Sequence, residues 1–167
     1  MKKLTANLLL TSLWMGIFSM PSHAATETGT AQANLLGGLS MAFTNDLNFG
    51  VILPPAEGDQ ITMSENTYSP SLTSASGGSL LSGIYTRGVF TITGTPNTLA
   101  AVQVSASTSL TGLGEAMIVD NFLVNRTQPD LGATGSTDVV VGGRLNINAN
   151  QTPGNYTGTY VITVTYM

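Results

Sequence analysis

The alternation of apolar and polar side chains at every second residue restricts the fold of this chain more than any other feature. In residues 159–166 every even-numbered side chain is apolar, and every odd-numbered one except Val161 is Thr. This period of two is typical of a β-strand with one buried face, because successive side chains point to opposite sides. The same alternation recurs in residues 88–93, 101–106 and 144–148. The chain is therefore predicted to be all-β.

Turn-forming residues separate these segments and define further strand candidates. The additional candidates are residues 33–43 with a break at Gly37-Gly38, 47–52, 60–64, 117–124 and 137–141. Pro and Gly clusters lie between the candidates, and Gly142-Gly143 is interpreted as one of the turns. No amphipathic segment suggests a crossover helix. Short strands at this spacing predict an antiparallel β-sandwich, formed as a single domain by residues 37–167.

The first 24 residues have the pattern of a secretory signal peptide. Lys2 and Lys3 precede an apolar run, residues 8–20, that is shorter than the roughly 20 residues of a membrane-spanning helix. Small residues at Ser22 and Ala24 then predict cleavage before Ala25, which fits better than a retained anchor. We expect Sec-dependent export in a bacterium, to the periplasm or the cell surface, and an N-terminal extension over residues 25–36.

Cleavage would leave 143 residues (167 − 24) without Lys, His or Cys. Hydrolytic triads need a histidine, a Ser-Lys dyad needs a lysine, and zinc sites are built mainly from Cys and His. Three arginines against nine carboxylates give a net charge of −6 (3 − 9), which argues against nucleic acid or an anionic membrane as partner. The sequence predicts no enzyme activity, no catalytic residue, no cofactor and no metal.

Two oxygen-rich pairs of residues are candidates for binding calcium. Asp46 with Asn48, and Asp120 with Asn121, place a carboxylate close to an amide oxygen. Neither belongs to a twelve-residue loop of alternating oxygen ligands. The preferred interpretation is that these residues form turns.

Two carboxylate pairs are candidates for glycoside chemistry. Glu57 with Asp59, and Glu115 with Asp120, are the close acidic pairs. Such a site also needs aromatic side chains that stack on sugar rings, and the only Trp lies in the predicted signal peptide. We therefore expect these residues to lie in loops without a catalytic role.

Several motifs resemble the DUF4402 family of exported bacterial β domains. They are DLNFGVI at residues 46–52, FTITG at 90–94, VGGRLNI at 141–147 and PGNYTGTYVITVTY at 153–166. The resemblance covers most of residues 33–166. The first and last of these motifs are also similar to spore coat U proteins and to fimbrial subunits assembled by the chaperone-usher route.

Fimbrial subunits of that type end in an alternating strand with a penultimate tyrosine and a glycine fourteen residues from the end. Tyr166 and Gly154 occupy those positions here. The resemblance implies that the sandwich is Ig-like and pilin-like. It also implies a non-enzymatic structural or adhesive surface protein, a fimbria-like subunit that pairs strands with itself or related subunits. A periplasmic chaperone and an outer-membrane usher are its implied partners. The chain differs from many such subunits in lacking a disulfide and in the weaker bulky alternation of residues 25–36.

The N-terminal extension is predicted to act as a detachable strand. The sequence stops at Met167, directly after a core strand, so no later strand is expected to cover that edge. Residues 25–36 either pair with their own domain, complete a neighbour, or form a loose tail. The suspected subunit-interaction residues are Ala31, Ala33, Leu35, Gly154, Tyr160, Ile162, Val164 and Tyr166. The alternative function is a monomeric secreted module that binds a glycan or depends on Ca2+.

Overall fold

The computed structural model describes residues 30–66, 71–76, 80, 81 and 83–167. The predicted signal peptide, residues 1–24, and the start of the extension lie outside the described residues. Contacts divide the chain into a first unit that ends at Asn34 and a second, compact unit over Leu35–Met167. The following description concerns the second unit, unless the first is named.

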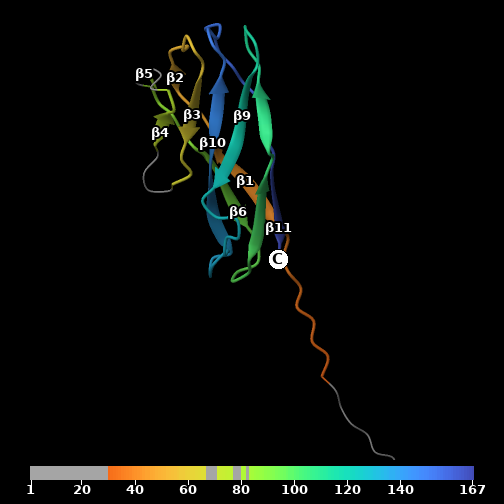
Figure 1. Ribbon diagram of the computed structural model, residues 1–167. Helices are drawn as coiled ribbons and strands as arrows, with labels where there is room; N and C mark the ends of the chain where they lie inside the picture. The colour runs from red at the N-terminus through yellow and green to blue at the C-terminus, as the bar shows by residue number, and fades with distance from the viewer. Residues whose placement is uncertain (1–29, 67–70, 77–79, 82) are drawn as a thin grey trace, which may run out of the picture. The chain divides into compact units, whose positions relative to one another are not determined.

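The described residues form β-strands and no helix, which confirms the predicted all-β class. The strands are β1 (Ser40–Asn45), β2 (Val51–Ile52), β3 (Asp59–Met63), β4 (Leu72–Ser74), β5 (Leu80–Leu81), β6 (Gly88–Thr93), β7 (Ala100–Val104), β8 (Ser107–Leu110), β9 (Met117–Val124), β10 (Ser136–Ile147) and β11 (Ile162–Tyr166). Every pair of strands is antiparallel, as expected for a β-sandwich (Figure 1).

The long strand β10 connects the two halves of the sandwich. On one edge its first half pairs with β6, from Ser136 to Val141, and its second half pairs with β3, from Gly143 to Ile147. On the other edge it pairs with β9. Strand β1 lies beyond β6, β4 beyond β3, and β8 beyond β9, while β11–β7 and β2–β5 form two small separate sheets (Figure 1).

The prediction of a turn at Gly142-Gly143 is wrong, because both residues lie inside β10. A Cβ atom on Gly142 would lie 2.3 Å from the backbone oxygen of Met63, and one on Gly143 would lie 3.2 Å from the ring of Phe122. The glycines are therefore needed for close packing and not for a change of direction.

Other strand predictions were confirmed in part. Residues 88–93 and 117–124 form β6 and β9 with the predicted bounds. Residues 33–39 form no strand, and the last strand begins at Ile162, later than predicted. The segment before Ile162 lies close to β8 instead: a Cβ on Gly158 would lie 2.3 Å from the oxygen of Ser109.

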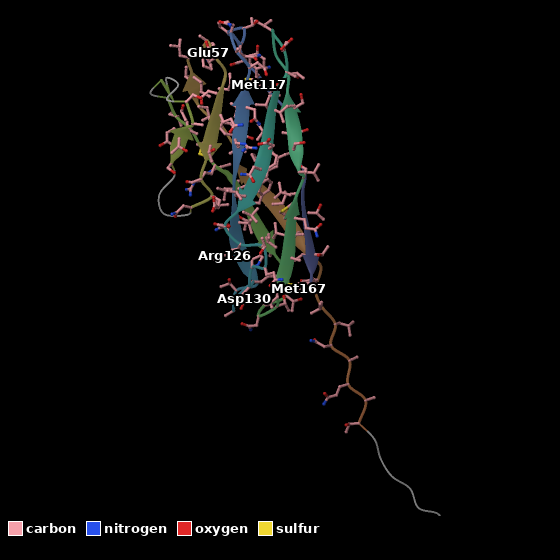
Figure 2. All side chains as sticks on the ribbon, in the orientation of Figure 1. Glu57, Met117, Arg126, Asp130 and Met167 are labelled. Atoms are coloured by element: carbon pink, nitrogen blue, oxygen red, sulfur yellow. The ribbon has the colours of Figure 1, made fainter. Side chains whose placement is uncertain are left out.

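The core consists of two clusters, one beside each half of β10. The first contains Ile92, Val102, Leu131 and Val139, with partly buried residues of β1 and β11 packed against it. The second contains Phe49, Ile61, Met63, Met117, Val119, Leu145 and Ile147. Figure 2 shows Met117, a member of the second cluster, near one end of the sandwich and Met167, which follows β11, at the other.

Candidate functional site

A groove of about 680 Å³ opens between residues 46–54 and residues 151–160. Its floor is formed by members of the second core cluster, namely Phe49, Met117, Val119, Leu145 and Ile147. Its rims carry polar residues such as Asp46, Asn48, Asn155 and Thr157. The groove therefore leads from a polar rim directly to the hydrophobic core, and we call it the core groove.

Both walls of the core groove are paired with other strands on one edge only. Asn48 forms a β-bridge with Thr86, and β2 pairs with β5. On the opposite wall Thr157 exchanges two backbone hydrogen bonds with Thr111. Within the described part of the chain, no hydrogen bond joins the two walls across the groove. Both walls thus have backbone groups available to another strand.

One end of the core groove is closed by Asn150. Its backbone N–H donates to the oxygen of Pro55 at 3.0 Å, and its side-chain amide donates to the oxygen of Ala56 at 3.3 Å. These bonds connect the segments from which the two walls extend. We call this the closed end of the groove.

A row of aromatic rings leads from the groove onto β6 and β1. Phe122 and Tyr160 line the groove and stack with ring centroids 5.0 Å apart. Tyr160 contacts Phe90 edge-on, and Phe90 contacts Phe43 edge-on. Phe43 remains 57% exposed, although it lies on the same side of β1 as the core-packed Met41. The apolar surface of the site thus extends past the groove itself.

Gln151 and Tyr156 form a polar network near the closed end. The Gln151 side-chain amide donates to the oxygen of Glu115 at 2.6 Å and to the Tyr156 hydroxyl at 2.9 Å. The same hydroxyl accepts from the N–H of Gly114 and donates to the oxygen of Thr152. The network holds the loop around Gly114 against the groove wall.

The structure places the predicted interaction residues in different surroundings. Gly154 and Tyr160 line the core groove. Ile162, Val164 and Tyr166 do not, because they pack against the first core cluster. Ala31, Ala33 and Leu35 are exposed and form no strand, with Leu35 84% exposed.

Sequence reasoning missed Gln151 and the floor residue Phe49. Phe49 lies within the DLNFGVI motif, so the motif did point to this wall. Gln151 stands between Asn150 and Thr152, and its neighbours resemble those of an ordinary turn. No local signal distinguishes it from a solvated loop residue.

The hydroxyl of Tyr166 holds the chain where the extension leaves the sandwich. It accepts a hydrogen bond from the N–H of Thr95 at 2.7 Å and donates one to the oxygen of Gly37 at 3.1 Å. Gly94 provides the space, since a Cβ there would lie 2.4 Å from this hydroxyl. Tyr166 thus fixes the start of β1 against the end of β11.

The hydroxyl of Tyr160, in contrast to that of Tyr166, forms no hydrogen bond within the described residues. It is buried and lies against Gly88, where a Cβ would be 2.2 Å from the hydroxyl. Burial, with a further contribution from the negative charge of Asp46, raises the pKa of Tyr160 to about 12. The ring packs well, but its polar atom is left without compensation.

We expect Tyr→Phe to change the free energy of unfolding differently at these two positions. Tyr166→Phe should lower the free energy of unfolding by about 1–3 kcal/mol, because the N–H of Thr95 loses its partner. Tyr160→Phe should leave stability unchanged or raise it slightly, because no hydrogen bond is lost. Urea unfolding followed by circular dichroism measures both, and equal losses would show that the hydroxyl of Tyr160 is bonded.

Two of the residues considered as calcium ligands, Asn48 and Asp120, have other partners. The Asn48 side-chain oxygen accepts from the N–H of Gly50 at 2.8 Å, which is a turn role. Asp120 receives two hydrogen bonds from Arg144, at 2.8 and 3.1 Å. The Arg144 hydrogen bond lowers the pKa of Asp120, against the opposing effect of desolvation. Among the described residues, no three His, Cys, Asp or Glu side chains gather as a metal site would require.

In each carboxylate pair that could support glycoside chemistry, the two members lie in different surroundings. Asp59 is buried and accepts from the Ser74 hydroxyl and from the N–H groups of Gln60 and Ser76. Burial raises the pKa of Asp59, but these hydrogen bonds outweigh it, so the pKa is lowered overall. Glu57 is exposed on the loop before β3, and Glu115 is exposed before β9. Asp59 thus serves to fix the turn beyond β4.

In the described part of the chain, no helix is long and apolar enough to cross a membrane. The fold and the site define an antiparallel β-sandwich domain whose core opens through a groove with unpaired strand edges. The model of a family described as a domain of unknown function, DUF4402, matches residues 39–166, and the chain belongs to this family. No curated protein and no solved structure matches the chain.

Proposed function

We propose that this chain is an exported, non-enzymatic subunit of a bacterial surface fibre, similar to a fimbria, and that its core groove receives a β-strand from a second copy. The observation that carries this proposal is the core groove. Its floor is apolar and both of its walls have an unpaired edge. An extended segment laid between the walls would bond to both edges and cover the apolar floor, which is the mode of β-strand addition.

The occupant that fits best is the N-terminal extension of another copy, residues 25–36. The walls are nine and ten residues long, which corresponds to about 30 Å of extended chain. Twelve residues are enough to fill this length, and Glu27 is their only charged residue. Within the extension, residues 30–36 are all exposed and belong to no strand. An alternating strand would direct Ala31, Ala33 and Leu35 to one face, which suits an apolar floor.

The same reasoning supports the proposed partners during export. An unfilled groove with two open edges invites aggregation, so a subunit of this kind needs a temporary strand until it assembles. A periplasmic chaperone would supply that strand, and an outer-membrane usher would exchange it for the next subunit. The resemblance of Gly154 and Tyr166 to positions of chaperone-usher subunits supports this route. Residues 1–24 would direct the export.

The experiment compares two acidic substitutions in the extension of the full chain, expressed with its own residues 1–24. Ala33→Asp places a charge on the face proposed to meet the apolar floor, and Asn34→Asp places the same charge on the opposite face. The unaltered chain and Asn34→Asp should form heat-sensitive ladders on gels and thin fibres in electron micrographs. Ala33→Asp should remain monomeric, because burying an unpaired carboxylate costs several kcal/mol.

Each other outcome contradicts the proposal. If Ala33→Asp assembles like the unaltered chain, the extension is not the inserted strand. If all three proteins are monomeric when secreted, the chain is not a fibre subunit, and a monomeric module that binds a glycan or Ca2+ becomes the better description. Mass analysis of the secreted product also shows whether cleavage occurs before Ala25.

A further inference from the structure

Three hydrogen bonds hold Gly37 just before β1, at the root of the N-terminal extension. The N–H of Gly37 donates to the hydroxyl oxygen of Thr95 at 2.7 Å, and its carbonyl oxygen accepts from the Tyr166 hydroxyl at 3.1 Å. The Tyr166 hydroxyl in turn accepts from the N–H of Thr95 at 2.7 Å. Both backbone groups of Gly37 are therefore bonded to side chains that are 58 and 129 residues away in the sequence. We call these three bonds the root clamp.

The sequence around Gly37 favours a different conformation, a β-hairpin. Gly37-Gly38 lies between two leucines, and short loops with glycine at positive φ are the usual connections between antiparallel strands. β1 is an edge strand: it pairs with β6 on one side, and no other strand in the described part of the chain pairs with its second side. A hairpin at the glycine pair would lay the extension along this free edge. In the structure neither glycine has a positive φ, so the hairpin is not formed.

A loop of three residues, 36–38, would give this hairpin a favourable register. It would pair Ala33 with Met41 and Ala31 with Phe43, so that apolar side chains would share the inward face of β1. The exposed ring of Phe43 would then be covered. Most of the extension would be used along β1, and only its beginning would reach the core groove. Such a self-paired chain could neither fill its own groove nor supply a strand to another copy.

We infer that the root clamp prevents the extension from pairing with its own β1 and so keeps it available for the core groove of another copy. This inference rests on the proposed strand insertion. A segment attached to the same chain competes at a roughly millimolar effective concentration, so the hairpin would compete strongly with a second copy. The clamp occupies both backbone groups of Gly37. It also confines Gly38, because the next residue, Leu39, packs against the first core cluster. Gly38 is the residue that needs a positive φ in the three-residue loop.

The test uses the full chain, exported with its own residues 1–24, and carries a reporter for self-pairing. Because the chain contains no Cys, Gln32→Cys and Ala42→Cys introduce a single pair of thiols, both at exposed positions. The hairpin would bring them opposite each other on its outward face, and the bacterial periplasm would oxidise them. Non-reducing gels and mass analysis distinguish a disulfide within one chain from one between two chains. Unheated gels show the fibre ladders.

Tyr166→Phe and Thr95→Val each remove part of the root clamp in this background. Each should raise the share of chains with an internal disulfide by about 3- to 10-fold, the range expected for the loss of one hydrogen bond, and should reduce the ladders. Thr98→Val is the matched control, because the Thr98 hydroxyl donates to the oxygen of Thr95 at 2.6 Å in the same loop without bonding to Gly37. It should behave like the chain with an intact clamp. If Tyr166→Phe does not fold, Thr95→Val carries the test.

Gly38→Val separates turning back from a general loss of stability. A Cβ at this position meets no atom within 4 Å, but valine disfavours the positive φ that the three-residue loop requires. Added to Thr95→Val, it should remove the extra internal disulfide and restore the ladders, although the clamp is still incomplete.

Three results overturn the inference while the proposed function stands, provided that the chain with an intact clamp forms ladders. The first is that both clamp variants form ladders and internal disulfides like that chain. The second is that Thr98→Val changes them as much as Thr95→Val does, and the third is that Gly38→Val restores nothing. If the chain with an intact clamp forms neither ladders nor fibres, the proposed function fails, and this inference fails with it.

Discussion

A Gly142→Val variant is expected to lose a large part of its stability to unfolding. A Cβ atom at this position would lie 2.3 Å from the backbone oxygen of Met63 and 2.8 Å from the backbone nitrogen of Glu65. Because the obstructing atoms belong to the backbone, they cannot move aside as a flexible side chain would. Strands β10 and β3 would have to separate, although both supply residues to the second core cluster.

The expected loss is at or above the upper end of the 1–3 kcal/mol that overpacking usually costs. That is a large fraction of the 5–15 kcal/mol that stabilises a typical domain. Gly38→Val is the matched control, because no atom lies within 4 Å of a Cβ there and its backbone has no positive φ. We expect the control to change stability by no more than about 0.5 kcal/mol. Equal urea midpoints for the two variants would contradict the close packing of β10 on β3.

The second large effect is expected on the inward face of β11. Ile162 and Val164 are half-buried and pack against the first core cluster. Replacing either residue by Asp would place a carboxylate without a partner against Ile92, Val102 and their neighbours, at a cost of several kcal/mol. We expect little soluble, folded protein from either variant.

Thr163→Asp is the matched control for this strand. Thr163 is exposed on the opposite face of β11 and pairs with Gln103 of β7. The same charge there remains in water, so the yield of folded protein and its melting temperature should stay close to those of the unaltered chain. A similar loss on both faces would show that the two faces of β11 have been assigned wrongly.

The alternation along the sequence is sufficient to predict the fold class and the faces of several strands. In β11 the burial pattern follows the period of two residue by residue, and the bounds of β6 and β9 agree with the prediction. This succeeds because the direction of a side chain in a strand depends on local geometry alone. The prediction fails at Gly142-Gly143, because the sequence does not distinguish a glycine required by close strand packing from a glycine that forms a turn.

Local sequence patterns are therefore enough to predict the all-β class, the two faces of several strands and the family, and the residue letters show that Lys, His and Cys are absent after residue 24. Where the sandwich stays open depends on contacts between distant segments, which no local pattern predicts. The core groove lies between segments about a hundred residues apart, and it exists because neither wall is paired with the other. The hydrogen bonds that hold Gly37 have the same origin: whether a backbone group has a partner depends on which distant groups the fold brings within hydrogen-bond distance.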